Sequence, residues 1–263
     1  MLLLNDDFQL RDQGVSNALN TGDLPRHRWY FVKEGFSPRL VERALQSEGV
    51  DEGEILLDPF SGGGTAPLTG AVMGMKARGF EVNPFLRFLS ATKLLQTEPK
   101  SLERSSKAIA KSMGKPIVSA LEGFSTFTKG NRWGRWLFPL DILRSFEGGM
   151  YGLSGVPQKH RNLLKLALLG AALDCCNAVR DGKCLRFQKG WQEDQASTAD
   201  LIHRFEDRVQ VITEDLDTSP LHNANAFVTE GDARKLVAKG RAEKFRLCVT
   251  SPPYLNSFDY SDV

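Results

Sequence analysis

The sequence has few of the features that mark secreted, metal-binding or membrane proteins. Among its 263 residues are four cysteines, and none stands in the C-x-x-C spacing of a zinc site. The first residues, MLLLNDDF, have no basic stretch before an apolar core, which argues against a signal peptide. The apolar stretch LLKLALLGAALDCC is interrupted by Lys165 and Asp174, so it is not a membrane span. These absences predict a soluble, cytoplasmic protein with no metal, no membrane partner and buried cysteines.

The net charge of +2 conceals an uneven distribution of charge along the chain. Residues 101–190 hold 15 Lys and Arg against 6 Asp and Glu, a net charge of +9, whereas the remainder carries −7. The basic middle predicts contact with a polyanion, although a solvated basic helical face would have the same composition. Within it, the segment RWGRW, residues 132–136, combines guanidinium groups with aromatic rings suited to sugar-phosphate contact. It could equally form an amphipathic edge of a core.

The N-terminal third predicts a βαβ unit. Ser37 and Pro38 form an N-cap and first helical position for GFSPRLVERALQSE. The continuous apolar run in GEILLDPF is typical of a strand buried in a parallel sheet, and it ends at Asp58. A glycine loop and an apolar helix follow in SGGGTAPLTGAVMGM, and KARGFEVNPF predicts a second strand that ends at Glu81.

The middle of the chain, from about residue 86 to 225, has a helical pattern. The clearest helices are predicted in QKHRNLLKLALLGAALDCCNAVR and ADLIHRFEDRVQVITEDL, and strand character returns in NAFVTEGDARKL and FRLCVTSPPY. We therefore expect an α/β core formed by residues 1–90 and 225–263. A basic, mainly helical insertion over residues 91–224 would interrupt it, and this insertion could contact DNA.

The glycine loop DPFSGGGT, residues 58–65, lies where an open α/β sheet binds ligands. No lysine follows the glycines, which excludes a P-loop, and Pro67 breaks the G-x-G-x-x-G spacing that Gly62 and Gly64 begin. Asp58 would repel a pyrophosphate. A ligand with a cationic end and a ribose remains, such as S-adenosylmethionine, although a plain tight turn is also compatible with the glycines.

Several motifs in order carry a resemblance to a known family. DPFSGGGT, GFEVNP, EGDARKL and TSPPY resemble the amino-methylating DNA methyltransferases, and HRWYFVKEGFSPRL resembles the segment beside the methionine end of their cofactor. The resemblance covers about residues 1–90 and 225–263. It implies a Rossmann-like, S-adenosylmethionine-dependent methyltransferase fold that acts on an exocyclic amine of adenine or cytosine in DNA.

The resemblance also implies cofactor contacts. The implied cofactor-binding residues are Phe36, Ser37, Asp58, Pro59, Phe60, Ser61, Gly62, Gly64, Thr65, Glu81, Asn83, Asp232 and Ala233. Asp58 would face the methionine portion together with the loop, Glu81 would accept from the ribose hydroxyls, and Asp232 from the adenine amino group. The alternative for Glu81 and Asp232 is a carboxylate that only caps a turn at a strand end.

The catalytic residues implied are Ser251, Pro252, Pro253 and Tyr254, at a rigid corner that lacks N–H donors. Ser251 Oγ and the Pro252 carbonyl would accept from the target amine and free its lone pair, while Tyr254 stacks on a base taken out of the duplex. Asn256, Asp259 and Tyr260 would bind the substrate. A serine at the first position of the motif is associated in the family with cytosine N4 rather than adenine N6.

The chain also departs from the family. Four strands are predicted, ending near Asp58, Glu81, Asp232 and Ser251, whereas the family sheet has seven in the order 3-2-1-4-5-7-6. The fourth strand would be an exposed apolar edge. We therefore expect a second polypeptide, self-association, or further sequence to complete the sheet. An RNA base-amine methyltransferase, or a non-catalytic cofactor- or DNA-binding subunit, are the alternative functions.

Overall fold

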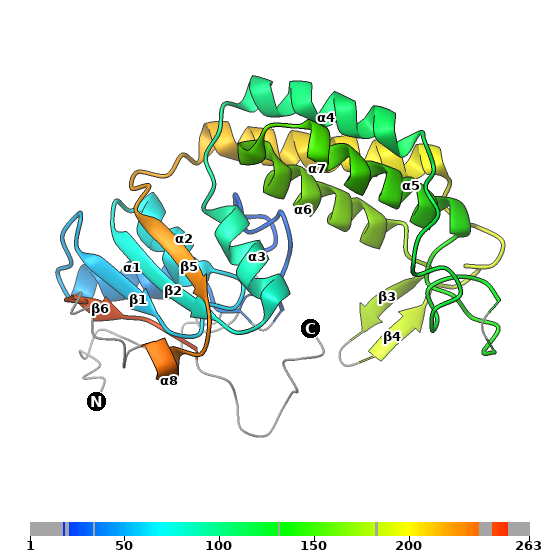
Figure 1. Ribbon diagram of the computed structural model, residues 1–263. Coiled ribbons are helices and arrows are strands. Elements are labelled where there is room, and N and C mark those ends of the chain that lie inside the picture. The colour runs from blue at the N-terminus through cyan, green and yellow to red at the C-terminus, as the bar shows by residue number, and fades with distance from the viewer. Residues whose placement is uncertain are drawn as a thin grey trace. The chain divides into compact units, whose positions relative to one another are not determined.

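The computed structural model describes residues 18, 21–33, 35–130, 132–181, 184–236 and 244–251. The chain divides into two compact units (Figure 1). The first comprises Met1–Gln96 and Thr218–Val263, and the second Thr97–Asp217.

The first unit is built on a parallel four-stranded sheet. Its strands are β1 (Ile55–Asp58), β2 (Lys76–Glu81), β5 (Ala226–Glu230) and β6 (Leu247–Cys248), in the order β5-β2-β1-β6. All three neighbouring pairs are parallel. This is the 3-2-1-4 order that the family resemblance implies, and the predicted Rossmann-like α/β fold is confirmed. The described ladder of β6 is only two residues long, and β5 ends two residues before Asp232.

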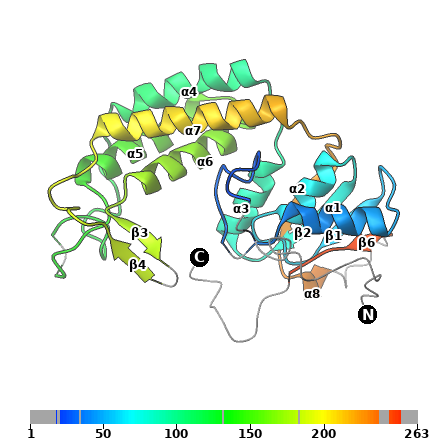
Figure 2. The same ribbon diagram turned by 180° about the vertical axis from the view of Figure 1, so that it is seen from behind.

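Helices pack on this sheet. They are α1 (Pro38–Ser47), α2 (Thr65–Val72) and α3 (Pro84–Lys93), and a short helix, α8 (Ala233–Leu236), follows β5 in the chain. Figure 2 shows α1 and α2 lying against one face of the sheet. Phe36, Val41 and Leu45 pack there with Leu56 and Ala77 of the two central strands. The helix start predicted at Ser37 is confirmed, because its Oγ accepts the Arg39 N–H at 3.3 Å.

A buried arginine ties together distant parts of the first unit. Arg26 is fully buried, and its guanidinium donates to the carbonyls of Lys93 and Leu95 at 2.9 and 2.8 Å. The same group donates to the Ser219 carbonyl at 2.9 Å and to the Gln96 side chain. Arg26 therefore holds both the segment where the chain leaves this unit and the segment where it returns.

The second unit is mainly helical. It contains α4 (Pro99–Met113), α5 (Leu140–Gly152), a short 3-10 helix η1 (Leu153–Gly155), α6 (Gln158–Asp174) and α7 (Thr198–Thr218). Both views show α4, α5, α6 and α7 side by side. Their shared core is made of fully or almost fully buried apolar side chains: Leu102, Ile109, Met113, Ile142, Leu163, Leu164, Leu166, Leu201, Phe205 and Ile212.

A β-hairpin in the second unit differs from the sequence prediction. Strands β3 (Ala178–Asp181) and β4 (Cys184–Phe187) pair antiparallel, whereas the helical pattern was expected to continue through this stretch to Arg180. Helix α6 ends at Asp174, and the N–H groups of Cys175 and Cys176 close its last turn. In the sequence, Gly182 follows the last residue of β3, and glycine is common at hairpin turns.

Other expectations from composition have mixed outcomes. Cys175 and Cys176 are buried, as predicted, but Cys248 on β6 is exposed, and the side chain of Cys184 lies outside the described residues. In the described part of the chain, no cluster of His, Cys, Asp and Glu side chains could hold a metal ion. No described helix is long and apolar enough to cross a membrane.

Candidate functional site

The parallel strands bring the candidate residues to one edge of the sheet. Asp58 ends β1 in register with Gly79 of β2, and Glu81 ends β2 in register with Glu230 of β5. Beyond β6, the Val249 N–H donates to the Leu57 carbonyl at 3.0 Å. The carboxyl ends of β1, β2, β5 and β6 therefore meet at one edge, where open α/β sheets bind ligands.

Asp58 is a buried carboxyl group at the centre of this edge. Its residue is only 1% exposed, and its Oδ1 accepts from Thr250 Oγ1 at 2.7 Å and from the Phe60 N–H at 3.1 Å. Its Oδ2 is buried and has no hydrogen-bond partner among the described residues. Burial, with a smaller contribution from the Glu81 charge, raises the pKa of Asp58 to about 6, although the two hydrogen bonds act in the opposite direction. Such a group would gain from a cationic ligand.

The glycine loop turns sharply away from Asp58. Ser61 donates from its N–H to the Phe80 carbonyl at 2.9 Å and from its Oγ to the Asp58 carbonyl at 3.2 Å. Gly62 and Gly64 have φ angles of 49° and 86°, which side-chain-bearing residues rarely adopt. A Cβ on Gly64 would also lie 2.7 Å from Ser90 Cβ. The glycines are therefore needed for the path of this loop into α2.

Glu81 links the glycine loop to the end of β2. Its Oε2 accepts the Gly62 N–H at 2.7 Å, and its Oε1 accepts the Asn83 N–H at 2.9 Å. Asn83 in turn caps α3, since its Oδ1 accepts from the Phe85 and Leu86 N–H groups. Each carboxylate oxygen has two acceptor positions, so Glu81 keeps capacity for ligand hydroxyls. Its role as a turn cap and its predicted role toward a ribose are compatible.

The segment before α1 lies against the same loop. A Cβ on Gly63 would lie 3.0 Å from Val32, and one on Gly35 would lie 3.9 Å from Thr65 Oγ1. Phe36 and Ser37, which follow in sequence, are both buried. Phe36 packs into the core beneath the sheet, so it has a structural role whether or not it contacts a ligand.

Lys93 is a component of the site that the sequence reasoning missed. Its Nζ donates to the Gly63 carbonyl at 3.1 Å, and the residue is 2% exposed. Burial lowers the pKa of Lys93 to about 7. His27 is also buried, and its pKa falls to about 3 through burial and, secondarily, the charge of Lys93. The only sequence signal was a lysine within the apolar helix PFLRFLSATK.

Asp232 is already engaged by a neighbour. Its carboxylate accepts from the Arg234 N–H at 3.0 Å and from Arg234 Nη2 at 2.6 Å. This pairing lowers the pKa of Asp232 to about 2. The Arg234 side chain is 83% exposed, so a ligand amino group would compete with a solvated partner rather than a buried one. The Gly231 N–H, which donates to the Glu81 carbonyl at 3.0 Å, ties this segment to β2.

The remaining predicted residues fall into two groups. Pro59 and Phe60 begin the loop, Phe60 being 40% exposed, whereas Thr65 and Ala233 are buried at helix starts. Ser251 directly follows Thr250, which bonds Asp58, and therefore begins the corner beside the glycine loop. The other predicted catalytic and substrate residues lie outside the described residues: Pro252, Pro253, Tyr254, Asn256, Asp259 and Tyr260.

Comparison with known proteins identifies relatives of this chain. The Type II methyltransferase M.BsoBI of Geobacillus stearothermophilus is 23% identical over 263 residues, a match that covers 89% of this chain and 50% of that protein. The chain is a homologue of type II methyltransferases. M.AvaI of Nostoc sp. and M.AvaI of Anabaena variabilis, both Type II methyltransferases, are each 23% identical over 253 residues, covering 90% of this chain and 52% of their own length.

The chain spans about half the length of the curated relatives it matches. No family model matches the chain, and no solved structure does. The matched region includes nearly the whole chain, so it extends over residues of both compact units. The relationship and the strand order agree on a Rossmann-like methyltransferase fold.

Proposed function

We propose that this chain transfers the methyl group of S-adenosylmethionine to the exocyclic amine of a DNA base, and that the base is cytosine and the acceptor N4. Asp58 is the observation that carries the proposal. A buried carboxyl group whose second oxygen has no described partner lies at the ligand-binding edge of the sheet. S-adenosylmethionine brings an ammonium and a sulfonium group, and either charge would stabilise the Asp58 anion.

The residues around Asp58 fit the other parts of the cofactor. Glu81 lies at the end of the second strand, the position from which a carboxylate accepts ribose hydroxyls in nucleotide-binding α/β folds. The loop from Ser61 to Gly64 carries no side chain larger than that of serine, so a ligand can approach its backbone closely. When bound, the cofactor supplies an electrophilic methyl group.

The chain's own residues would prepare the target amine. Ser251 Oγ and the Pro252 carbonyl are proposed to accept from its two N–H groups, which draws the nitrogen toward tetrahedral geometry and frees its lone pair. Thr250, bonded to Asp58 at 2.7 Å, joins this corner to the cofactor site. Because the reaction needs in-line approach of amine and methyl group, catalysis would consist mostly of positioning. Tyr254 is proposed to stack on the extruded base.

Completion of the sheet is part of the proposal. Strand β6 pairs with β1 on one side, and no other described strand borders it. Leu247 and the exposed Cys248 thus form an apolar edge, which proteins normally cover. We infer that a second polypeptide, a second copy or further sequence of the same polypeptide covers it in the active enzyme. An active monomer, established by light scattering under assay conditions, would contradict this inference.

A product assay tests the proposed reaction. The chain is incubated with S-adenosylmethionine and unmodified DNA, and the DNA is digested to nucleosides for mass spectrometry. N4-methylcytosine is expected. N6-methyladenine would overturn the assignment of the base, and methylation of RNA but not of DNA would overturn the substrate. If no base is methylated, the chain does not act by itself, and adding the covering partner becomes the next test.

A further inference from the structure

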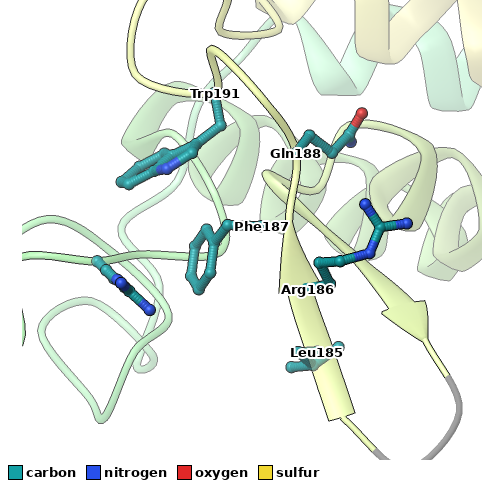
Figure 3. A pocket seen from close by; sticks show the side chains of 6 residues that line it. Leu185, Arg186, Phe187, Gln188 and Trp191 are labelled. Carbon is teal, nitrogen blue, oxygen red and sulfur yellow. The ribbon is translucent and has the colours of Figure 1, made fainter.

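A groove opens on the second unit, within residues 97–217. It has a volume of about 420 Å³ and is lined by Arg135, Leu185, Arg186, Phe187, Gln188 and Trp191. Figure 3 shows the rings of Phe187 and Trp191 on one side of β4 and the side chains of Arg186 and Gln188 on the other. The volume falls within the range of sites for small ligands or single nucleotides.

The aromatic wall of this groove is held by packing and hydrogen bonds. Trp191 lies edge-on to Trp136, with ring centroids 4.6 Å apart, and its ring is 5.0 Å from that of Phe187. The buried Asn177 donates from Nδ2 to the Trp136 carbonyl at 3.1 Å and from its N–H to the Leu137 carbonyl at 2.7 Å. The loop before α5 and the segment after β4 are thus joined into one surface.

Gln188 is also held in place. Its N–H donates to the Asn177 carbonyl at 2.9 Å, and its Nε2 donates to the Cys176 carbonyl at 2.9 Å. The side-chain amide is therefore oriented by the backbone at the end of α6. Its Oε1 remains an acceptor for a ligand, in a fixed direction.

The surroundings of the groove are basic. The described segments that carry its lining residues, 129–130, 132–136 and 185–194, contain Lys129, Arg132, Arg135, Arg186 and Lys189 against Glu193 and Asp194. The lining itself holds two arginines and no acidic side chain. The guanidinium of Arg135 lies over the Phe187 ring, 5.8 Å from its centroid. Phe187 and Trp191 are half-buried, and positive charge beside accessible aromatic rings is the combination that binds the backbone and bases of unpaired nucleic acid.

We propose that this groove binds an unstacked nucleotide of the DNA substrate, with the base against Phe187 and Trp191 and the phosphate on Arg135. The proposal rests on the proposed function and deepens it by naming residues that hold DNA outside the methyl-transfer site. The base must be unstacked, because bases within a duplex do not present their faces to side chains. Gln188 lies on the other side of β4 from the two rings, so the base contact is assigned to the rings alone.

Direct binding to a labelled single-stranded DNA of about ten nucleotides tests this site, measured by fluorescence anisotropy. Phe187→Leu is expected to weaken binding about tenfold, since loss of one stacked base has an effect of that order. Its matched control is Trp133→Leu, because Trp133 is 63% exposed in the same basic loop but does not line the groove. The control should keep binding within about twofold.

The phosphate contact is tested by the salt dependence of the same binding. Arg135→Gln should lower the slope of log affinity against log salt by about one, which is the effect of losing one phosphate contact. Its matched control is Arg132→Gln, at an exposed arginine 4.4 Å from the Trp133 ring. This control should leave the slope unchanged. Arg135 is itself exposed, so its substitution is not expected to prevent folding.

The outcomes separate this site from the proposed function. If Phe187→Leu and Trp133→Leu weaken binding equally, the surface is diffuse and the groove proposal is wrong. If a single-stranded RNA of the same sequence binds more tightly than the DNA, the assignment to DNA is wrong. S-adenosylmethionine binding is measured on the same proteins. If the wild type binds both DNA and cofactor, and Phe187→Leu binds DNA as tightly as the wild type, this proposal alone is wrong. A wild type that binds cofactor but no nucleic acid would overturn both.

Discussion

Replacing Asp58 by asparagine should change how the stability of the protein without cofactor depends on pH. The pKa of Asp58 rises from 3.8 to about 6 in the folded protein, chiefly because the group is buried. Between these two values the folded state binds more protons than the unfolded state. Linkage then requires that the Asp58 contribution to stability falls as pH rises through this interval, and stays low above it.

The size of the effect follows from the two pKa values. A shift of about two units, at 1.36 kcal/mol per unit, amounts to about 3 kcal/mol in the limit of high pH. Between pH 4 and pH 8 about 2–3 kcal/mol of this should appear, because the unfolded carboxyl is already partly ionised at pH 4. Solvent screens the Asp58 charge little, because the residue is 1% exposed.

Urea unfolding at several pH values measures the prediction as a difference between proteins. The free energy of unfolding of Asp58→Asn minus that of the wild type should increase by about 2–3 kcal/mol from pH 4 to pH 8. Asp51→Asn, at an exposed carboxylate of the same unit, is the matched control for removal of a charge and should give a much smaller change. If the two variants show the same pH dependence, Asp58 is not the desolvated group described above.

Three further predictions concern other residues of the first unit. The pKa of Lys93 is lowered to about 7, so above pH 7 the unfolded state binds one proton more than the folded state, and stability should rise between pH 7 and 10. In urea unfolding, Lys93→Met should abolish this rise, and an unchanged pH profile would contradict the burial of the amine. Arg26→Met should cost about 3 kcal/mol or more in the same assay, because it leaves one buried and two partly buried carbonyls without this donor, and a loss below 1 kcal/mol would contradict its bridging role. Ser251→Ala should lower methyl transfer at least about a hundredfold while cofactor affinity changes less than about twofold, and an equal fall in both would refute the role given to its hydroxyl.

The positions of the strands could be predicted from strong local signals, whereas their order was implied by the family resemblance. The run Ile55 to Leu57 is apolar on both faces, and such strands occupy the middle of parallel sheets. The ends of β1 and β2 followed from Asp58 and Glu81, where the apolar run stops. Apolar runs that stop at a polar residue also predicted the positions of β5 and β6. The lengths of these two strands depend on their hydrogen bonding to neighbouring strands, which a single segment does not reveal.

The hairpin in the second unit was missed because a helical pattern continues past the end of α6. The spacing of apolar residues remains helical through Cys175 and Cys176, and a single glycine, Gly182, is the signal for a turn that follows. One residue weighs less than a long periodic pattern. The groove beside β4 was therefore not foreseen, although RWGRW had been recognised as suited to sugar-phosphate contact.

Other parts of the site depend on tertiary structure that no short segment encodes. Lys93 lies on a helix, and only the packing of α3 against the glycine loop buries its amine. The Asp58 pairing with Thr250 joins residues 192 positions apart. The ion pair between Asp232 and Arg234 joins residues two positions apart, but it depends on the rotamers of the two side chains as well as on their residue types.

Calorimetric titration of the chain with S-adenosylmethionine at pH 7.5 tests the central claim most directly. Binding of one cofactor per chain is expected for the wild type, and it should weaken at least about tenfold in Asp58→Asn and in Glu81→Gln. Affinity for the wild type should also fall as pH drops below about 6, where Asp58 takes up a proton, and this pH dependence should be absent in Asp58→Asn. A wild type that binds no cofactor, or variants that bind as tightly as the wild type, would contradict a cofactor site at the carboxyl edge of β1 and β2.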